Sequence, residues 1–438
     1  MSNYNNVKIA VIGAGITGQS CVRYLTSKGA KVTVFDTRQR SHNVLHVLWG
    51  EIEIDRLLNF SLIVVSPGVS LSTPAICKAI AAGIKVVGDV ELFARENSVP
   101  AIGITGSNGK STVVSLLGEI FSEAEFNVCV SGNIGTPVLN TLTDISTGQS
   151  KKYDWYVLEL SSFQLESTFS LNLDIACILN LSEDHLDRHG NMTEYRAAKQ
   201  RIYAHANNRI ICRDEPLLAY SRQDDTLTFG LSSSSVGMSW EPSTQTIIYQ
   251  GEAFLHFADC QLSGLHNILN IQAASLIAIQ AGIGFESILS AVKRFSGLPH
   301  RYQSLSTTDK INWINDSKAT NPGATNVSLR TAISDTQGQL ILIVGGDAKQ
   351  ADLSILKEQI VNSVSYLIAL GKDGRQFMPL AQRAIYVDSM TQAVNVAATT
   401  AMPGDTVLLS PACASLDMFE NFEHRGNCFV AAVEALVA

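Results

Sequence analysis

The sequence predicts an α/β protein of three consecutive domains: an N-terminal Rossmann-like domain, a central P-loop ATPase-like domain with a parallel sheet plus a small antiparallel sheet, and a C-terminal Rossmann-like domain. Three observations predict this. The chain has 438 residues, too many for one hydrophobic core. Short apolar runs alternate with helical patterns in three successive stretches, as in parallel sheets with crossover helices. Segments 94–100 and 296–301, which contain proline, separate these stretches and place the domains at residues 1–93, 94–298 and 299–438.

The strands are predicted from apolar runs of strand length. In the first stretch they cover residues 7–12, 31–35, 62–65 and 84–87, with a helix at 74–82. In the second they cover residues 101–105, 126–130, 155–160 and 176–181, followed by a small antiparallel insertion within 226–262 and a helix at 266–281. In the third they cover residues 311–314, 339–344, 364–370 and 406–409.

The composition restricts the class of partner. Hydrophobic residues make up 46% of the chain and charged residues 16%, the latter below the roughly 25% of an average soluble protein. This balance fits sheets covered by helices on both faces. The formal net charge of −8 argues against nucleic acid as a partner, so an anionic substrate has to be held locally by Lys, Arg and helix N-termini.

Cysteine usage and the apolar runs bear on the compartment. The eight cysteines are scattered, with no C-x-x-C pair, which is typical of reduced thiols in the cytoplasm. The first residues lack the basic segment of a signal peptide. Apolar runs such as residues 340–344 have the length of a strand, far short of a membrane span. We therefore expect a cytoplasmic protein without a membrane partner.

A glycine-rich turn follows the first predicted strand. Gly13, Gly15 and Gly18 have the spacing G-x-G-x-x-G, and Asp36 ends the next apolar run. In a Rossmann fingerprint these glycines let the backbone approach a pyrophosphate, and the acid binds a ribose hydroxyl. The pattern alone does not distinguish a nicotinamide cofactor from another nucleotide.

A second glycine-rich loop, TGSNGKST, follows the strand that ends at Thr105. Backbone N–H groups in such a loop cradle phosphate oxygens, Lys110 would neutralise β/γ charge, and the Ser111 hydroxyl would ligate Mg²⁺. A strict Walker motif needs glycine at position 104, where this chain has Ile104. The position of the loop between a strand and a helix nevertheless favours a binding site for a nucleoside triphosphate.

Two further strand ends carry ionisable residues that suit a metal site. Glu159 lies near the end of an apolar strand, where an unpaired carboxylate is costly. His185 follows another strand beside three acids, Glu183, Asp184 and Asp187. Hard Mg²⁺ prefers oxygen ligands, and clustered ionisable groups indicate function. A solvated acid and a structural histidine are the alternative interpretations.

The motifs along the chain resemble, in order, those of the Mur ligases. They are TGSNGKST, LELSSFQLE, NLSEDHLDRH, YRAAKQRIY, SGLHNILN, GLPHR, NDSKATNP and SPACASLDMFENFEHRG. The resemblance covers essentially the whole chain. It implies an ATP-dependent amide ligase of peptidoglycan precursor synthesis. The segments DTR, SPGV and SPACASLDMFENFEHRG point to the member that adds D-glutamate to UDP-N-acetylmuramoyl-L-alanine.

For the first domain, the resemblance implies that the glycine turn holds the UDP moiety of the substrate and not NAD. Ile16 and Thr17 would contact the diphosphate, and Asp36, Thr37 and Arg38 would face uracil. Gly68 would line the same pocket, and Asn133 would lie near the reacting carboxylates.

For the central domain, the resemblance implies an ATP site with two Mg²⁺ ions. The ATP contacts would be Gly106, Ser107, Asn108, Gly109, Lys110, Ser111 and Thr112, with Asn267 and Asn270 on the adenine side. The metal ligands would be Ser111, Glu159, His185 and Lys199, the last as an N6-carboxylated (carbamate) lysine. From the residues alone Lys199 is a helix lysine whose amine is solvated, and the carbamate is known only from the resemblance.

For the third domain, the resemblance implies residues that close on ATP and hold the amino acid. Arg301 would reach the γ-phosphate, Asp316 would contact the ribose, and Lys318 would face the transferred phosphoryl group. D-glutamate would be bound by Thr320, Lys349, Ser415 and the backbone around Phe422. The catalytic set would be Lys110, His185, Lys199, Lys318 and Arg301. We expect a monomer, since no association helix is evident.

Three alternatives remain open at this point. Another ligase of the same superfamily, which includes folylpolyglutamate synthase, would differ in the amino acid added. A nicotinamide dehydrogenase would use the turn at Gly13–Gly18 for its cofactor. A nucleotide-gated binding protein would bind the triphosphate at Lys110 without turnover.

Overall fold

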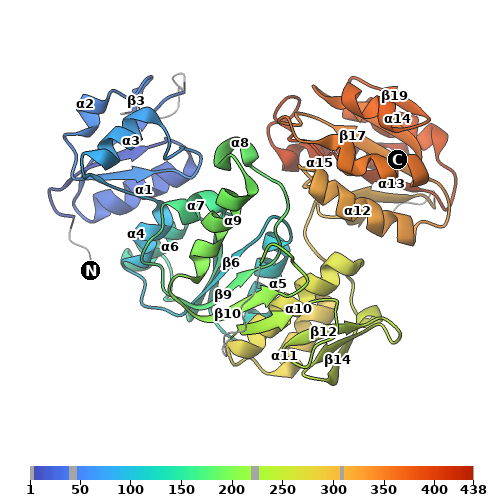
Figure 1. Cartoon of the computed structure of the whole chain (residues 1–438), viewed down its shortest axis with the longest axis horizontal. Helices are drawn as coiled ribbons and strands as arrows, with labels where there is room; N and C mark the ends of the chain where they lie inside the picture. Colours follow the sequence, from blue (N-terminus) through green and yellow to red (C-terminus); the bar gives the residue numbers. More distant parts are fainter. Residues whose placement is uncertain (1–3, 39–46, 219–225, 306–309, 438) are drawn as a thin grey trace. The chain divides into compact units, whose positions relative to one another are not determined.

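The computed structural model describes residues 4–38, 47–218, 226–305 and 310–437 (Figure 1). Contacts divide the chain into two compact units. Unit 1 holds residues 1–181, 188–260 and 268–295. Unit 2 holds residues 182–187, 261–267 and 296–438.

The first sheet of unit 1 is parallel, with the strand order β3-β2-β1-β4-β5. Its strands are β1 (Lys8–Ile12), β2 (Lys31–Asp36), β3 (Val47–Trp49), β4 (Leu62–Val65) and β5 (Lys85–Val87). Its helices are α1 (Ile16–Ser27), α2 (Ile54–Leu57), α3 (Pro74–Ala81) and α4 (Asp89–Ala94). The strand order reverses between β1 and β4, and a ligand crevice is expected at the carboxyl ends of these two strands.

The second sheet of unit 1 is also parallel, with the order β11-β10-β9-β6-β8-β7. Its strands are β6 (Ala101–Thr105), β7 (Val128–Gly132), β8 (Trp155–Glu159), β9 (Leu173–Ile178), β10 (Ala206–Cys212) and β11 (Thr226–Phe229). The helical segments are α5 (Lys110–Glu123), α6 (Val138–Ser146), α7 (Ser162–Glu166), α8 (Leu186–His189), α9 (Met192–Gln200), η1 (Arg201–Tyr203), α10 (Leu265–Gln280) and α11 (Phe285–Arg294). The first residues of α8 and α10, 186–187 and 265–267, belong to unit 2. Strand β6 is central and leads directly into the phosphate loop and α5, so the fold predicted for this region is confirmed.

One apolar core joins the two parallel sheets. Buried side chains of α1 and α4 form a single cluster with those of α6 and β8. Within it the rings of Phe93 and Tyr156 pack edge to face with centroids 4.8 Å apart. At its margin the Arg23 guanidinium lies 2.7 Å from the Asp144 carboxylate. The two sheets therefore belong to one packed body.

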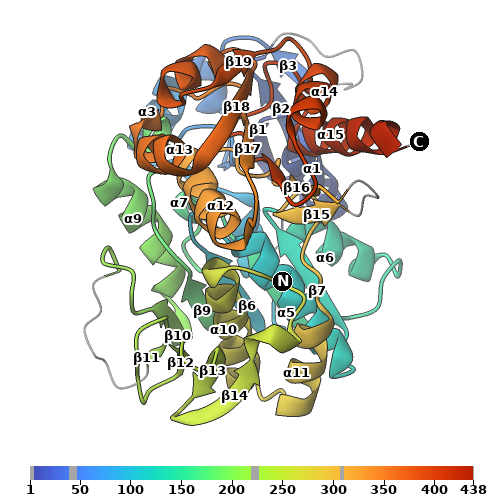
Figure 2. The same ribbon diagram turned by 90° about the vertical axis from the view of Figure 1, so that its right-hand side faces the viewer.

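The antiparallel insertion is smaller than predicted. It consists of β12 (Met238–Glu241), β13 (Thr246–Tyr249) and β14 (Glu252–His256). The first strand of the predicted range, β11, instead pairs in parallel with β10, so that part of the prediction is wrong (Figure 2). Thr226 and Phe229 are buried by this pairing. Alternating apolar residues show that a strand exists but not which neighbour it pairs with.

The strand predicted at residues 176–181 is shifted. Strand β9 runs from Leu173 to Ile178. Its apolar run continues beyond the sheet because Leu179 and Leu181 stay buried, with the Leu179 N–H donating to the Thr105 carbonyl under the phosphate loop at 3.0 Å. Buried apolar residues in this loop give the same sequence pattern as a buried strand, so the predicted strand extended too far.

Unit 2 contains one six-stranded sheet in the order β15-β16-β20-β17-β18-β19. Its strands are β15 (Gln303–Leu305), β16 (Asn312–Asn315), β17 (Leu340–Gly345), β18 (Val364–Leu370), β19 (Ala384–Tyr386) and β20 (Thr406–Leu409). Its helices are α12 (Pro322–Asp335), α13 (Lys357–Ser363), α14 (Met390–Thr400) and α15 (Phe422–Val437). Helices α12 and α13 cover one face and α14 and α15 the other (Figure 2). The predicted Rossmann-like character is confirmed, with β15 as an antiparallel edge strand.

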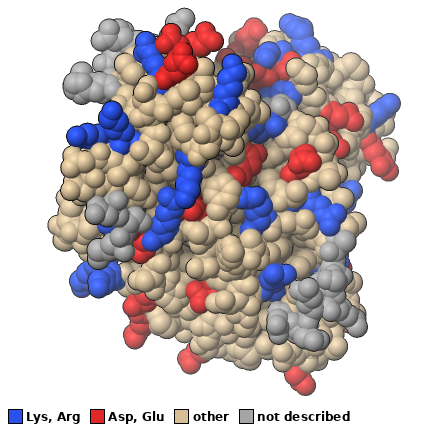
Figure 3. All heavy atoms as spheres, turned by 60° about the vertical axis from the view of Figure 1, so that its left-hand side comes forward, with Lys and Arg blue, Asp and Glu red and all other residues tan. Residues whose placement is uncertain are grey.

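The surface carries both signs of charge. On the face in Figure 3, Lys and Arg side chains are interspersed with Asp and Glu, and most of the area is uncharged. Within the described residues, no helix has the length and apolar character needed to cross a membrane.

Candidate active site

A pocket of about 620 Å³ opens at the carboxyl ends of β1 and β4 in unit 1. The glycine turn, the segment after β2 and the loop after β4 form most of its wall. Gly132, Asn133 and Gln164 complete the wall from the second sheet. Every residue that the resemblance assigns to the UDP-linked substrate lines this pocket, namely Ile16, Thr17, Asp36, Thr37, Arg38, Gly68 and Asn133.

Close backbone packing shapes the glycine turn. Gly13 has φ +102°, a conformation that L side chains rarely adopt. A Cβ at Gly18 would lie 1.8 Å from the Gly13 carbonyl oxygen, whereas a Cβ at Gly15 would meet nothing within 4 Å. The third glycine therefore lets α1 pack on β1, and the second leaves open space on the pocket side.

Asp36 fixes this turn through its carboxylate. Its Oδ2 accepts the Ala14 N–H at 2.8 Å, and its Oδ1 accepts the Arg38 N–H and Nε–H at 3.0 and 2.9 Å. The Arg38 Nη2 lies 2.6 Å from Oδ2. The hydrogen bond from Arg38 lowers the pKa of Asp36 to about 2. Both carboxylate oxygens thus hold protein donors and keep the turn and the following loop together.

The phosphate loop lies between β6 and α5. Gly109 is the N-cap of α5 with φ 83°. The loop is held by the Asn180 side chain, which accepts the Asn108 N–H and donates to the Asn108 carbonyl at 2.8 and 3.0 Å. The Lys110 ammonium bends back to the carbonyls of Gly106 and Ser107 at 2.7 and 2.9 Å. This arrangement presents backbone N–H groups and one cation to an anion at the helix N-terminus.

Glu159 ends β8 beside the phosphate loop. Its side chain is buried, and its Oε2 accepts the Ser111 hydroxyl at 2.7 Å. Its Oε1 accepts the Asn133 side-chain N–H at 2.9 Å. The interpretation of Glu159 as a solvated acid is therefore wrong. The carboxylate and the hydroxyl form a pair of oxygen donors of the kind that magnesium prefers.

The side chain of Lys199, on α9, contacts the start of the phosphate loop. Its side chain is 2% exposed, so the interpretation as a solvated helix lysine is wrong. Its Nζ donates to the Gly106 carbonyl at 2.9 Å and lies 3.4 Å from the Thr105 hydroxyl. It also lies 4.7 Å from the ring centroid of Tyr195, whose hydroxyl is 3.0 Å from the Ser107 hydroxyl. Lys110 and Lys199 thus share one carbonyl acceptor.

The two asparagines of α10 face different surroundings. The Asn270 side chain abuts Gly109, where an added Cβ would lie 2.4 Å from its Oδ1. Asn267 belongs to unit 2, donates to the Ser263 carbonyl at 2.7 Å and lines a cavity of about 500 Å³ together with Arg301 and Tyr302. The predicted adenine contacts of the two asparagines stay predictions.

His185 lies in unit 2. Its side chain is 41% exposed, its φ is 56°, and its Nε2 lies 3.6 Å from the Asp184 carboxylate. Asn321, the N-cap of α12, donates to the same carboxylate at 3.3 Å. The Asp187 side chain lies outside the described part of the structure. Within the described residues, no three His, Cys, Asp or Glu side chains converge on a common metal position.

The predicted D-glutamate residues gather at the carboxyl ends of neighbouring strands in unit 2. Thr320 follows β16, Lys349 follows β17, and Ser415 follows β20. Lys318, predicted to face the transferred phosphoryl group, also follows β16. The Lys318 ammonium lies 3.6 Å from the ring centroid of Phe422. Loops at adjacent strand ends form the usual binding edge of an open α/β sheet.

Asp316, predicted to contact the ribose, is buried directly after β16. It accepts the Ser328 and Ser410 hydroxyls at 2.5 and 2.8 Å and the Tyr302 N–H at 3.1 Å. Burial raises the pKa of this carboxyl to about 6. The side chain therefore connects the segment after β16 with α12 and with the end of β20.

Arg425 on α15 was not among the predicted site residues. Its side chain is almost fully buried and donates to the Ser317 hydroxyl and carbonyl at 3.0 and 2.8 Å and to the Cys413 carbonyl at 3.0 Å. Burial lowers its pKa to about 10. The motif SPACASLDMFENFEHRG contains this arginine, but an arginine in a helix pattern carries no signal of burial. Gln164, Tyr195 and Asn180 were also not predicted, since their contacts with the pocket and the phosphate loop depend on segments distant in sequence.

Family comparisons divide the chain in the same order as its sheets. Residues 7–88 match the model described as "Mur ligase MurD-like, N-terminal domain". Residues 104–278 match "Mur ligase middle domain", and residues 300–413 match "Mur ligase, glutamate ligase domain".

Whole-chain relatives and solved structures agree with these matches. A protein of Pasteurella multocida named "UDP-N-acetylmuramoylalanine--D-glutamate ligase" is 42% identical, covering 98% of both chains. One of the same name from Escherichia coli O6:H1 is 41% identical, covering 100% of both. The solved UDP-N-acetylmuramate-alanine ligase MurC of Thermotoga maritima aligns with a TM-score of 0.63 at 16% identity, over 98% of this chain and 100% of that one. At that identity it shows a shared fold.

Proposed function

Because this chain belongs to the Mur ligase family, we propose that it joins D-glutamate to the alanyl carboxyl group of UDP-N-acetylmuramoyl-L-alanine and converts ATP to ADP and phosphate. The full-length relatives at about 40% identity carry the name of this activity. This proposal excludes the nicotinamide dehydrogenase considered for the glycine turn.

One observation carries the proposal. Asn133 lines the nucleotide pocket and also donates to Glu159, which accepts the hydroxyl of Ser111 in the phosphate loop. The far end of a uridine-linked substrate and the phosphates of ATP would therefore meet around Asn133. Such a meeting is what a carboxylate that attacks ATP requires.

The reaction proceeds through an acyl phosphate. A carboxylate oxygen of the alanyl group attacks the γ-phosphorus, the bond to the β-phosphate oxygen breaks, and ADP leaves. The D-glutamate nitrogen then attacks the acyl carbon, and the bond to phosphate breaks to leave the amide. The amine must lose its proton, for which His185 and the phosphate oxygens are candidate acceptors. Lys110, Arg301 and Lys318 would offset the negative charge of the approaching anions.

The residues at the loop fit magnesium. The Ser111 hydroxyl and the buried Glu159 carboxylate lie 2.7 Å apart at the start of α5, and both offer hard oxygen donors. His185 would serve a second ion. When bound, magnesium supplies positive charge at the phosphate oxygens.

Lys199 would act as a carbamate ligand of the second ion. Its amine shares the Gly106 carbonyl with Lys110, and two neighbouring ammonium groups repel each other. Attack on CO₂ requires the neutral form of this amine. The carbamate would then place negative charge beside Lys110. In Lys199→Ala, short carboxylic acids should restore part of the lost activity, and full activity without rescue would remove Lys199 from the site.

The assay that tests the function is ADP release with the uridine-linked substrate, ATP, magnesium and one amino acid at a time. D-glutamate should support release, whereas L-glutamate, L-alanine and meso-diaminopimelate should not. Lys110→Ala should abolish release, and the exposed Lys151→Ala should leave it unchanged as a matched control. Release with a different amino acid would make the chain another ligase of the family, and binding of ATP without any release would favour a binding protein.

A further inference from the structure

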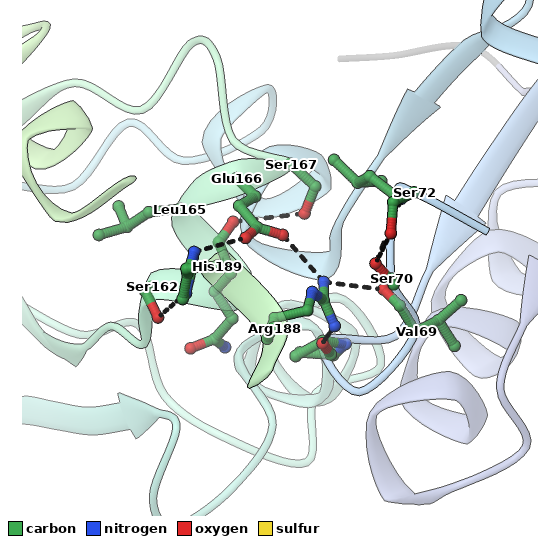
Figure 4. A network of polar contacts seen from close by, with 12 residues as sticks. Val69, Ser70, Ser72, Ser162, Leu165, Glu166, Ser167, Arg188 and His189 are labelled. Carbon is green, nitrogen blue, oxygen red and sulfur yellow. Dashed lines mark hydrogen bonds and ion pairs between the residues drawn. The ribbon is translucent and has the colours of Figure 1, made fainter. Parts of the chain in front are cut away.

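Arg188, at the end of α8, reaches across to the loop that follows β4 (Figure 4). Its Nη2 donates to the Val69 carbonyl at 3.1 Å, and its Nη1 lies 3.5 Å from the Pro67 carbonyl. The same Nη2 lies 2.8 Å from the Glu166 carboxylate. A residue of the second sheet's connections thus holds the backbone of the first domain at two points.

The held loop is a wall of the nucleotide pocket. Residues 66–70 all line it. The loop is also tied to the glycine turn, because the Ser66 hydroxyl donates to the Gly13 carbonyl at 3.3 Å. A displacement of this loop would therefore reach the backbone that faces the diphosphate.

Arg188 is itself firmly anchored. Its side chain is 13% exposed, and its guanidinium lies 4.7 Å from the ring centroid of Phe163. The other oxygen of Glu166 is 3.2 Å from His189 Nδ1, and His189 Nε2 is 3.0 Å from the Ser162 hydroxyl. Phe163 and Glu166 belong to α7, which begins shortly after Glu159. Arg188 thereby fixes the position of the loop at residues 66–70 relative to α7, which follows the proposed metal ligand Glu159.

We propose that Arg188 is a positioning residue for the uridine-nucleotide substrate: it sets the loop at residues 66–70 against α7 and so fixes the pocket wall relative to the phosphate loop. This inference rests on the proposed function. It adds a residue that does not line the pocket and that acts through backbone carbonyls.

The charge of the pocket explains why such positioning matters. Among the described residues that line it, the charged side chains are Asp36 and Arg38, and they are paired with each other. A diphosphate must therefore be bound largely by backbone N–H groups, whose hydrogen bonds are sensitive to small displacements. Because the Arg38 cation is already paired with Asp36, the position of the pocket wall decides how well the backbone N–H groups reach the diphosphate.

The test compares two arginines by calorimetric titration with UDP. Arg188→Ala should weaken UDP binding about 10- to 150-fold, as expected when one charge-assisted hydrogen bond to the diphosphate is lost. The KM for the uridine-linked substrate should rise, and the KM for ATP should stay unchanged. Added guanidinium ion should restore part of the UDP affinity to Arg188→Ala.

Arg201→Ala is the matched control. Arg201 also donates to two carbonyls, those of Leu165 and Thr168, at 2.7 and 2.8 Å, and lies 5.1 Å from the Phe169 ring centroid. It does not line the nucleotide pocket. Its loss should lower thermal stability as much as that of Arg188 and leave UDP affinity unchanged.

The outcomes are distinct. If wild type binds UDP and Arg188→Ala binds it with the same affinity, the inference is overturned and the proposed function stands. The same conclusion follows if Arg201→Ala weakens UDP binding as much as Arg188→Ala does. Absence of UDP binding by wild type would overturn the proposed function itself. If Arg188→Ala does not fold, Arg188→Lys serves instead, since one ammonium cannot span Glu166 and both carbonyls. Normal UDP affinity in that variant would overturn the inference.

Discussion

A single methyl group added at Gly18 should weaken UDP binding at the nucleotide pocket and leave ATP binding at the phosphate loop unchanged. The Cβ of Gly18→Ala would lie 1.8 Å from the Gly13 carbonyl oxygen, and this neighbour is backbone that cannot rotate away. The turn would have to move by more than about 1 Å to reach an ordinary contact, which costs about 1–3 kcal/mol of stability for overpacking of this kind.

The same displacement should weaken UDP binding. The turn presents its N–H groups to the diphosphate, and a charge-assisted hydrogen bond is worth about 1.5–3 kcal/mol. Losing one such bond corresponds to a rise in Kd of about 10- to 150-fold. The phosphate loop at Lys110 is built on a different strand, so ATP binding should be unaffected.

Two further glycine variants make the measurement specific. Gly284→Ala, at the N-cap of α11, adds a methyl group with nothing within 4 Å and should change neither thermal stability nor UDP affinity. Gly15→Ala also has open space in the protein, so any loss of UDP affinity at unchanged stability would come from contact with the ligand. Unchanged stability together with unchanged UDP affinity in Gly18→Ala would refute the reasoning.

Three other outcomes follow from particular contacts. Glu159→Gln should reduce magnesium-dependent ADP release at least about 100-fold, and an unchanged magnesium dependence would contradict its role as a ligand. Arg425→Met leaves buried carbonyls without their donor, so the free energy of unfolding measured in urea should fall by about 3 kcal/mol. Activity assays should show a raised KM for D-glutamate, while UDP affinity should be retained. The pKa of Asp36 is about 2 in the folded protein against 3.8 ordinarily, so the stability it contributes is present above about pH 4 and is lost as the pH falls toward 2. Arg38→Met brings that pKa back toward 3.8, so its melting temperature should lie below that of wild type near neutral pH and should fall less than that of wild type between about pH 4 and pH 2.

The sequence predicted the strands where burial and regular structure coincide. Strands β4, β18 and β20 have the predicted bounds because their apolar runs end where the sheet ends. The prediction failed at β9, where buried residues continue under the phosphate loop, and at β11, whose parallel partner is distant in sequence. The domain boundaries at residues 93 and 298 and the roles of the individual site residues stay predictions.

Tertiary structure decided which charged side chains are buried and which groups they bind. Sequence spacing indicated a phosphate loop and an acid at a strand end, but only packing shows that Glu159 accepts Ser111 and Asn133 and that Lys199 is buried beneath Gly106. Arg188 and Arg425 carried no signal at all, since an arginine bound to backbone carbonyls has the same sequence context as a solvated one.

The sequence by itself determined the order of the three α/β domains, the two glycine-rich turns and the family, because periodicity, backbone freedom and motif spacing are local along the chain. The three-dimensional arrangement decided which of those motifs share a site. Asn133 joins the nucleotide pocket to the phosphate loop through contacts between segments far apart in sequence, and such contacts depend on the pairing of strands and the packing of side chains.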